Sequence, residues 1–173
     1  MPSRIGLIGG ECTGKSTLAL ALGRALPACV VPEVLRETVD RLGRTPLPSE
    51  QAAIMAEQIT REQAAALSCE HPWLVADPAP LMTAVYSVQY FADDSLVRAA
   101  VEQAQGYDLI VWCDVDLPWT PDGAQRDGAV TRERTDQIVA AMVRDELEPL
   151  GSTVIKVTGG LADRVAAVLA ALA

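Results

Sequence analysis

Short apolar runs alternate with longer segments of helical character along the chain. Runs of four or five mainly apolar residues predict five buried strands, at residues 4–8, 28–32, 73–76, 109–113 and 153–157. The segments between and after them have the composition and spacing of helices, at residues 18–26, 34–42, 50–68, 81–91, 95–105, 131–147 and 161–172. Strands that alternate with helices predict an α/β three-layer sandwich, in which a mainly parallel sheet carries helices on both faces.

The length of the chain suits one domain. Its 173 residues are enough for one well-buried core and few for two, so we expect a single domain over residues 1–173. No apolar run approaches the ~20 residues that cross a bilayer. The first expected strand begins almost at Met1 and leaves no room for a cleavable signal peptide, so we expect a cytoplasmic location. Ser49 follows a loop with prolines and is the expected N-cap of the helix at 50–68.

Polar residues follow directly after each expected strand. They occupy positions 9–17, 33–37, 77, 114–116 and 158–160. Right-handed crossovers bring the carboxyl ends of parallel strands to one edge of a sheet, and ligands of open α/β sheets bind at that edge. We therefore expect these residues to form the functional site.

The first of these polar segments has a phosphate-binding pattern. Gly9, Gly14, Lys15 and Ser16 fit G-x-x-x-x-G-K-[ST], the P-loop. The glycines let the backbone curl so that successive N–H groups point at an anion, and the following helix adds the positive end of its dipole. The alternative is a glycine-rich turn with an incidental lysine, but a strand before the loop and a helix after it favour a P-loop NTPase. The predicted nucleotide-binding residues are Gly9, Gly10, Glu11, Cys12, Thr13, Gly14, Lys15, Ser16 and Thr17.

Three P-loop side chains and one acid predict how ATP and Mg²⁺ are held. Lys15 places a charge on the β- and γ-phosphates, Ser16 offers its hydroxyl to Mg²⁺, and Thr17 reaches another phosphate oxygen. Asp77 ends the expected third strand, where an acid can hold the metal ion directly or through water. The alternative for Asp77 is to cap the next helix. Lys15 and Asp77 are thus catalytic candidates, and Ser16 and Asp77 are the metal candidates.

Glu33 stands at the end of the expected second strand, where a carboxylate can position and deprotonate an acceptor hydroxyl. Arg36, one helical turn later, can hold the acceptor. A solvated Glu–Arg pair at the start of a helix fits the spacing equally well. The sequence also leaves open whether Glu33 or Asp77 is the base.

Arginines gather in a polar segment after the fourth strand, residues 114–134, which contains prolines and glycines. Arg126, Arg132 and Arg134 predict a lid that clamps the phosphoryl group during transfer. A solvated charged loop is the alternative for this cluster.

Charge and cysteine spacing limit the other classes of function. The net charge of −9 argues against a nucleic acid or an anionic membrane as partner, because both need basic patches. The four cysteines form no C-x-x-C pair, which argues against zinc and predicts buried, reduced thiols. His71 is the single histidine, so multi-histidine sites are excluded. A small-molecule acceptor is the expected partner, and a homo-oligomer is compatible with the sequence.

Four stretches of the chain resemble the NadR-type kinase domain. They are GGECTGKSTL at 9–18, PEVLRE at 32–37, VAD at 75–77 and, most particular, DLIVWCDVDLPWTPDGAQR at 108–126. The resemblance covers residues 4–160 and implies phosphorylation of nicotinamide riboside by ATP with Mg²⁺ in NAD salvage. With 173 residues and one histidine, the chain has no place for the adenylyltransferase domain of bifunctional relatives, so we expect a kinase domain standing alone.

The resemblance also implies roles for individual residues. Lys15, Ser16 and Thr17 match positions that bind ATP and Mg²⁺, and Asp77 matches the acid at the strand end. The acceptor-side and lid-side positions are Glu33, Arg36, Asp116, Trp119, Asp122 and Arg126. Trp119 can stack on a pyridinium ring, or it can be an ordinary packing residue.

One departure from the family pattern keeps a second hypothesis open. Many relatives read Asp-Thr-Asp where this chain reads Asp77-Pro78-Ala79, which removes a hydroxyl and a second acid near the metal. The leading hypothesis is a small-molecule kinase. The alternative is a P-loop ATPase or nucleotide-sensing module that phosphorylates no metabolite. A regulatory GTPase would need an Asn-Lys-x-Asp motif, and the chain contains no asparagine.

Overall fold

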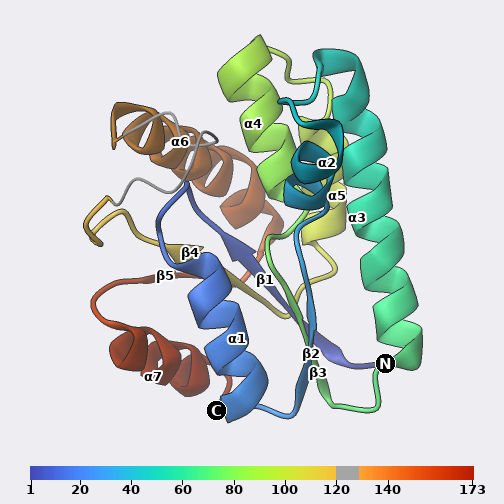
Figure 1. The fold of residues 1–173 in the computed structure, drawn as a ribbon. Helices are drawn as coiled ribbons and strands as arrows, with labels where there is room; N and C mark the ends of the chain where they lie inside the picture. Colours follow the sequence, from blue (N-terminus) through green and yellow to red (C-terminus); the bar gives the residue numbers. More distant parts are fainter. Residues whose placement is uncertain (120–128) are drawn as a thin grey trace.

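A parallel sheet forms the centre of the computed structural model, which describes residues 1–119 and 129–173. Its strands lie in the order β2-β3-β1-β4-β5 (Figure 1). Their bounds are β1 Ser3–Ile8, β2 Ala28–Val31, β3 Trp73–Ala76, β4 Leu109–Cys113 and β5 Val154–Val157. Every pairing is parallel; Ile5 of β1, for example, lies opposite Val75 of β3 and Leu109 of β4. This confirms the α/β fold with a five-stranded sheet that the sequence predicts.

Helices cover both faces of the sheet (Figure 1). One face carries α1 Lys15–Ala25 and α7 Leu161–Ala171. The other face carries α3 Pro48–Ser68, α4 Leu81–Phe91, α5 Val97–Ala104 and α6 Ala129–Met142, while the short α2 Val34–Leu42 packs on α3. The helix expected at 131–147 is divided, because a π-helical turn, Val143–Leu147, and a 3₁₀ turn, Glu148–Leu150, follow α6.

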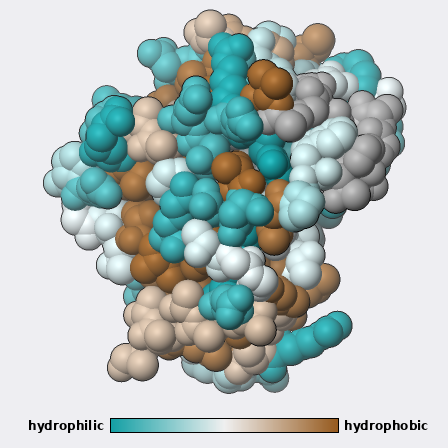
Figure 2. Space-filling view, turned by 90° about the vertical axis from the view of Figure 1, so that its left-hand side faces the viewer, coloured by the Kyte–Doolittle hydropathy of each residue, from teal (hydrophilic) through white to brown (hydrophobic). Residues whose placement is uncertain are grey.

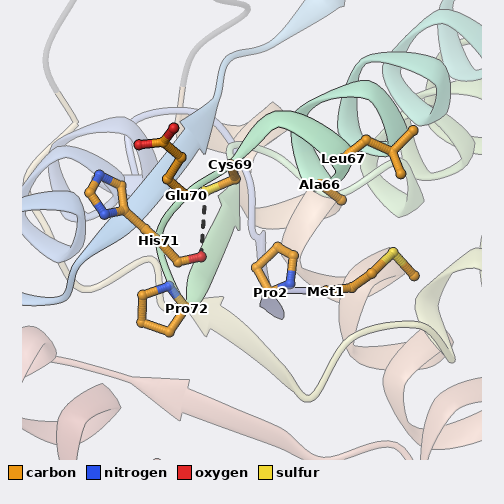
Figure 3. A pocket seen from close by; sticks show the side chains of 8 residues that line it. All are labelled: Met1, Pro2, Ala66, Leu67, Cys69, Glu70, His71 and Pro72. Carbon is orange, nitrogen blue, oxygen red and sulfur yellow. Dashed lines mark hydrogen bonds between the residues drawn. The ribbon is translucent and has the colours of Figure 1, made fainter.

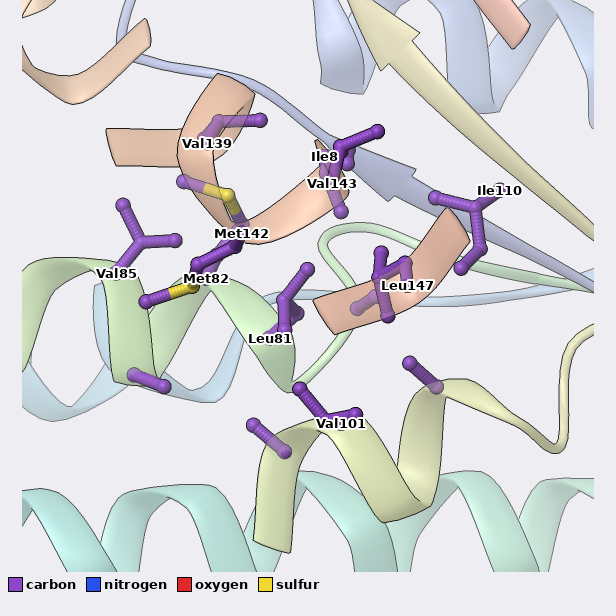
Figure 4. Close-up of a cluster of buried hydrophobic side chains, with 14 of the residues drawn as sticks. Ile8, Leu81, Met82, Val85, Val101, Ile110, Val139, Met142, Val143 and Leu147 are labelled. Carbon is purple, nitrogen blue, oxygen red and sulfur yellow. The ribbon is translucent and has the colours of Figure 1, made fainter. Parts of the chain in front are cut away.

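The sheet separates two hydrophobic cores. Ile5 and Leu7 of β1 point toward α1 and α7, whereas Ile8 packs with α3 to α6. Figure 4 shows the second core, in which Ile8 and Ile110 of the sheet meet side chains of α4, α5, α6 and the π-helical turn. Burial of these apolar side chains is the main force that holds the layers together.

The start of α3 corrects one expectation. Pro48 is the first residue of the helix and Leu47 is its N-cap, so Ser49 lies inside the first turn and is not the cap. Proline suits the first helical position because its φ is already helical and its missing N–H has no partner there. The Glu50 carboxylate accepts a hydrogen bond from the Leu47 N–H at 2.7 Å, which satisfies the amide of the N-cap residue itself.

The cysteines correct another expectation. Cys29, in β2, and Cys69, just after α3, form a disulfide with their Cα atoms 6.1 Å apart. They are therefore not reduced thiols as expected, because folding places the end of α3 beside the start of β2. Cys12 and Cys113 are not part of a disulfide, and burial raises the pKa of the Cys113 thiol to about 11.

A depression lies beside this disulfide, at the amino-terminal ends of β1 and β3 (Figure 3). It is lined by Met1, Pro2, Ala66, Leu67, Cys69, Glu70, His71 and Pro72. The Cys69 sulfur is 3.7 Å from the His71 carbonyl oxygen, a contact without a hydrogen because the sulfur is oxidised. The depression is at the edge of the sheet opposite the P-loop, so it is separate from the candidate site.

The outer surface is mixed in character. On the face turned to the viewer in Figure 2, hydrophilic side chains lie among hydrophobic ones. The exposed large apolar residues come from different elements, among them Leu20 of α1, Leu67 of α3 and Val130 of α6. Within the described part of the chain, no helix is both long enough and apolar enough to span a bilayer.

The disulfide predicts a dependence of stability on redox conditions. It closes a loop between residues 40 positions apart. Loop-closure entropy predicts that Cys29→Ala with Cys69→Ala lowers the free energy of unfolding by about 2–4 kcal/mol. Urea unfolding with and without dithiothreitol measures this. The reductant should destabilise the wild type to the level of the double variant and leave that variant unchanged; equal stability of both proteins under all conditions would contradict the disulfide.

Candidate functional site

The loop between β1 and α1 has the backbone that its glycines predict. Gly9 has φ +137° and Gly14 has φ +80°, conformations that L-residues with side chains rarely adopt. A Cβ atom at Gly9 would lie 2.7 Å from the Cys113 carbonyl oxygen, at the end of β4. The loop is therefore folded tightly against the sheet edge, and glycine at position 9 is required both for its φ and for the close approach.

Lys15 holds its ammonium group over this loop. Its Nζ donates to the carbonyl oxygens of Gly9 and Gly10, each at 2.7 Å. The Thr13 hydroxyl donates to the Gly10 carbonyl oxygen at 2.8 Å, so the loop also has an internal brace. Gly14 is the N-cap of α1 and has no side chain to cap the first helical turn. A cation next to an uncapped helix start fits a phosphate group.

Glu33 lies where β2 ends, beside the P-loop lysine. Burial raises the pKa of its carboxyl, the charges of Lys15 and Arg36 oppose that shift, and Asp77 adds to it, so that the pKa lies above its usual value. The Arg36 Nε is 3.6 Å from the Glu33 carboxylate. The structure therefore brings together Lys15, Glu33, Arg36 and Asp77, which come from three different strand ends.

Asp77 follows β3 directly and is 8% exposed. Its N–H donates to the Val31 carbonyl oxygen at 2.9 Å, which holds it at the edge between β2 and β1, and its peptide bond to Pro78 is cis. Its charge acts on both Glu33 and Cys113. Ser16, in the first turn of α1, is exposed. One carboxylate and one hydroxyl fit Mg²⁺, which takes few protein ligands when phosphates supply the rest.

Tyr86 of α4 lies near Glu33, with Tyr90 next to it on the same helix, and neither was predicted from the sequence. Tyr86 is 8% exposed, and burial raises the pKa of its hydroxyl well above the usual value, with further contributions from the charges of Glu33 and Glu11. The rings of Tyr86 and Tyr90 are 6.1 Å apart. The spacing of four residues on a helix is the signal for such a pair, but it is equally typical of ordinary packing.

The arginines expected in a lid are separated by the fold. Arg132, on α6, is 9% exposed and lies on the P-loop: its carbonyl oxygen is 3.3 Å from a Cβ placed at Gly10, and its guanidinium donates to the Leu117 carbonyl oxygen at 2.8 Å. Arg134 instead lines a surface groove between α4, α5 and α6. The structure thus brings Arg132 to the P-loop and leaves Arg134 elsewhere. Asp122 and Arg126 lie outside the described residues.

The residues that follow β4 turn toward α7. The Asp116 carboxylate accepts the Gly159 N–H at 2.5 Å and pairs with Arg164, so both of its oxygens are engaged within the chain. Trp119 is partly buried, and its indole N–H has no hydrogen-bond partner among the described residues. Of these two residues expected on the acceptor side, Asp116 makes structural contacts within the protein. Trp119 instead has an indole N–H that can donate a hydrogen bond.

Arg164 is a further site residue that was not predicted from the sequence. It is 1% exposed, and its guanidinium donates to the carbonyl oxygens of Thr13 at 2.6 Å, Gly159 at 2.9 Å and Asp114 at 3.4 Å. With Asp116 as its ion partner, it joins the P-loop to the segments after β4 and β5. The available signal was an arginine one turn before Val168 on the inward face of an amphipathic helix.

Comparison with known proteins identifies the fold. A family described as an AAA domain matches residues 4–164. A structure of a NadR protein with NAD and AMP-PNP has a TM-score of 0.76 at 18% identity, over 99% of this chain and 48% of that chain. A NadR structure with NR has a TM-score of 0.69 at 17% identity, over 90% and 43%. This chain therefore spans about half the length of the NadR chains that it matches.

A nucleoside kinase has the same fold over its whole length. The deoxyadenosine kinase of M. mycoides with bound dATP has a TM-score of 0.65 at 11% identity, over 98% of both chains. No curated protein matches this sequence. The NadR-type resemblance is confirmed in fold, and the fold is that of P-loop kinases.

The contacts of Arg164 generate a prediction about nucleotide affinity. Arg164→Met removes the anchor of the Thr13 carbonyl and leaves Asp116 without its cation. We expect the free energy of unfolding to fall by about 2–4 kcal/mol and the Kd for a non-hydrolysable ATP analogue to rise about ten-fold. Urea unfolding and calorimetric titration measure the two effects. Arg24→Met, at an exposed position of α1, is the control; a Kd that stays the same in both variants would contradict the role of Arg164.

Proposed function

This chain belongs to the AAA domain family, and we propose that it is an ATP-dependent kinase for a hydroxyl group of a small nucleoside-type acceptor, with nicotinamide riboside as the first candidate. The observation that carries the proposal is the position of Glu33. A partly buried carboxylate with a raised pKa faces the P-loop lysine at the edge of the sheet. A protein that only bound ATP would need no base at this position, whereas transfer of phosphate to a hydroxyl group needs one.

The donor half of the site holds ATP. The backbone at 9–17 and the start of α1 surround the phosphates, and Lys15 places its charge on the transferring group. Ser16 and Asp77 are the residues that would hold Mg²⁺, which when bound neutralises charge on the phosphate oxygens. Because Lys15 is held by the carbonyl groups of Gly9 and Gly10, it is already oriented before the nucleotide arrives.

Glu33 has the role of general base in this proposal. Its raised pKa brings it closer to neutral pH, where a base transfers protons most effectively. It accepts the proton of the acceptor hydroxyl while the oxygen of that group attacks the γ-phosphorus and ADP leaves. Asp77, the other candidate from the sequence, is assigned to the metal because it follows β3, next to β1 and the P-loop.

The acceptor half is formed by α2 and α4. Arg36 is exposed next to Glu33 and can hold the hydroxyls of the acceptor, while Tyr86 and Tyr90 supply aromatic surface. Aromatic rings near carboxylates suit a cationic ring such as a pyridinium. The NadR structures with NAD and NR support this acceptor through the shared fold. Asp122 and Arg126 remain expected acceptor-side and lid-side residues, and a place in NAD biosynthesis and in the cytoplasm belongs to the same proposal.

One observation favours a second candidate function. Pro78 and Ala79 follow Asp77, and Ala79 is 2% exposed, so these two positions offer no side-chain acid or hydroxyl to an acceptor. An ATPase or nucleotide sensor that phosphorylates no metabolite is consistent with that feature. In an ATPase, Glu33 would orient and deprotonate a water molecule in place of an acceptor hydroxyl.

The test is transfer of labelled phosphate. The protein is incubated with γ-labelled ATP, Mg²⁺ and a panel of nucleosides that includes nicotinamide riboside. We expect one phosphorylated nucleoside, its formation reduced at least about 100-fold by Lys15→Met and about 10²–10⁴-fold in kcat by Glu33→Gln, with ATP affinity kept in the second variant.

Glu37→Gln is the matched control for Glu33→Gln, because Glu37 is an exposed carboxylate one turn further along α2. It should keep the activity within about two-fold of the wild type, as surface substitutions usually do. Release of inorganic phosphate at one rate with every acceptor, and no labelled nucleoside, would favour the ATPase and reject the kinase.

A further inference from the structure

A network of buried polar side chains, linked by hydrogen bonds, lies beneath the acceptor side of the site. It begins at Glu62 of α3, which is 0% exposed. The Glu62 carboxylate accepts the Tyr107 hydroxyl at 2.6 Å, pairs with the Arg4 guanidinium at 2.5 Å, and lies 3.4 Å from the side-chain amide nitrogen of Gln58. None of these residues belongs to the donor or acceptor half described above.

This hydrogen-bond network ends at the backbone next to Glu33. Gln58 is 3% exposed, and its Oε1 accepts the Val34 N–H at 3.0 Å. Val34 is the first residue of α2, and Glu33 is its N-cap. The first amides of a helix have no partner inside the helix, and a side chain at the N-cap commonly accepts from one of them. Glu33 makes no such bond.

We propose that Gln58 is a positioning residue for Glu33: by accepting the first amide of α2 it fixes the backbone at the end of β2 and leaves the Glu33 carboxylate directed at Lys15 and Asp77. The proposal rests on the proposed function, in which Glu33 is the base. It assigns to α3 a part in the reaction, although α3 contributes no residue to the donor or acceptor half.

Glu62 determines the orientation of the Gln58 side chain. A glutamine amide has one end that accepts and one that donates. With the NH₂ group directed at the Glu62 carboxylate, the oxygen is left for Val34. The reversed amide would put NH₂ against the Val34 N–H and oxygen against a carboxylate, two repulsive contacts in a buried place. Arg4 and Tyr107 both donate to the other oxygen of Glu62, so the carboxylate keeps its position and the Gln58 amide has one favourable orientation.

The test removes the hydrogen-bond acceptor of the Val34 N–H and then restores it in a second variant. Gln58→Met keeps the volume and deletes both ends of the amide. We expect kcat to fall about ten-fold, part of what a general base contributes, with the KM for ATP within about two-fold because the P-loop is untouched. NMR should show faster exchange of the Val34 amide and a displaced carboxyl signal for Glu33.

Gln58→Glu combined with Glu62→Gln is the rescue. It places a carboxylate at position 58, where it accepts the Val34 N–H, and an amide at position 62, whose NH₂ group donates to that carboxylate. The net charge does not change. We expect it to return kcat, the Val34 exchange rate and the Glu33 signal most of the way to wild type. Gln51→Met is the control for the NMR readings, since Gln51 is also buried on α3, seven residues away, and its Oε1 has no partner among the described residues.

An unchanged Val34 exchange rate or an unchanged Glu33 signal in Gln58→Met would overturn the proposal, as would a double variant no better than the single one. The NMR readings need no turnover. If the wild type phosphorylates no nucleoside while Gln58→Met still displaces Glu33, the kinase has failed and the positioning of Glu33 by Gln58 stands.

Discussion

The buried guanidinium of Arg164 is the interaction on which the site depends. A charge that is 1% exposed is stable only if its N–H groups find acceptors. Those acceptors are the Thr13 carbonyl of the P-loop, the Asp114 carbonyl and Asp116 carboxylate after β4, and the Gly159 carbonyl after β5. Because one side chain serves three strand ends, movement of any of these segments would cost the buried guanidinium one of its hydrogen bonds.

The acceptor side is also held in place by buried polar side chains. Val34 and Glu33 lie where β2 passes into α2, and Gln58, with Glu62 behind it, supplies the acceptor that the helix start lacks. Arg164 reaches the edge from α7, and Gln58 reaches it from α3. These two helices cover opposite faces of the sheet, so the donor and acceptor halves are braced from opposite sides, and Lys15 of one half lies near Glu33 of the other.

Local pattern explains what the sequence could predict. The strands at Trp73–Ala76 and Leu109–Cys113 and the helix at Val34–Leu42 have the expected bounds, because apolar runs and helical spacing are read over a few residues. The P-loop could also be predicted, since its glycines and lysine lie close together in the sequence. Arg164 meets Thr13 across 151 positions, and Cys29 meets Cys69 across 40, so only the assembled sheet shows those contacts. The expected N-cap at Ser49 is wrong because proline favours the first helical position, so that the helix begins at Pro48.

In the proposed kinase, Glu33 is a base whose ionisation is set by burial and by its neighbours at the sheet edge. A base must be ionised, so kcat/KM should fall as the pH falls through the pKa of Glu33, which lies above that of an ordinary glutamate. The pH profile of kcat/KM in the wild type and in Arg36→Gln is the most direct test, with the exposed Arg41→Gln on the same helix as control. Loss of the Arg36 charge should move the acidic limb to higher pH; a limb that stays in place would contradict the account.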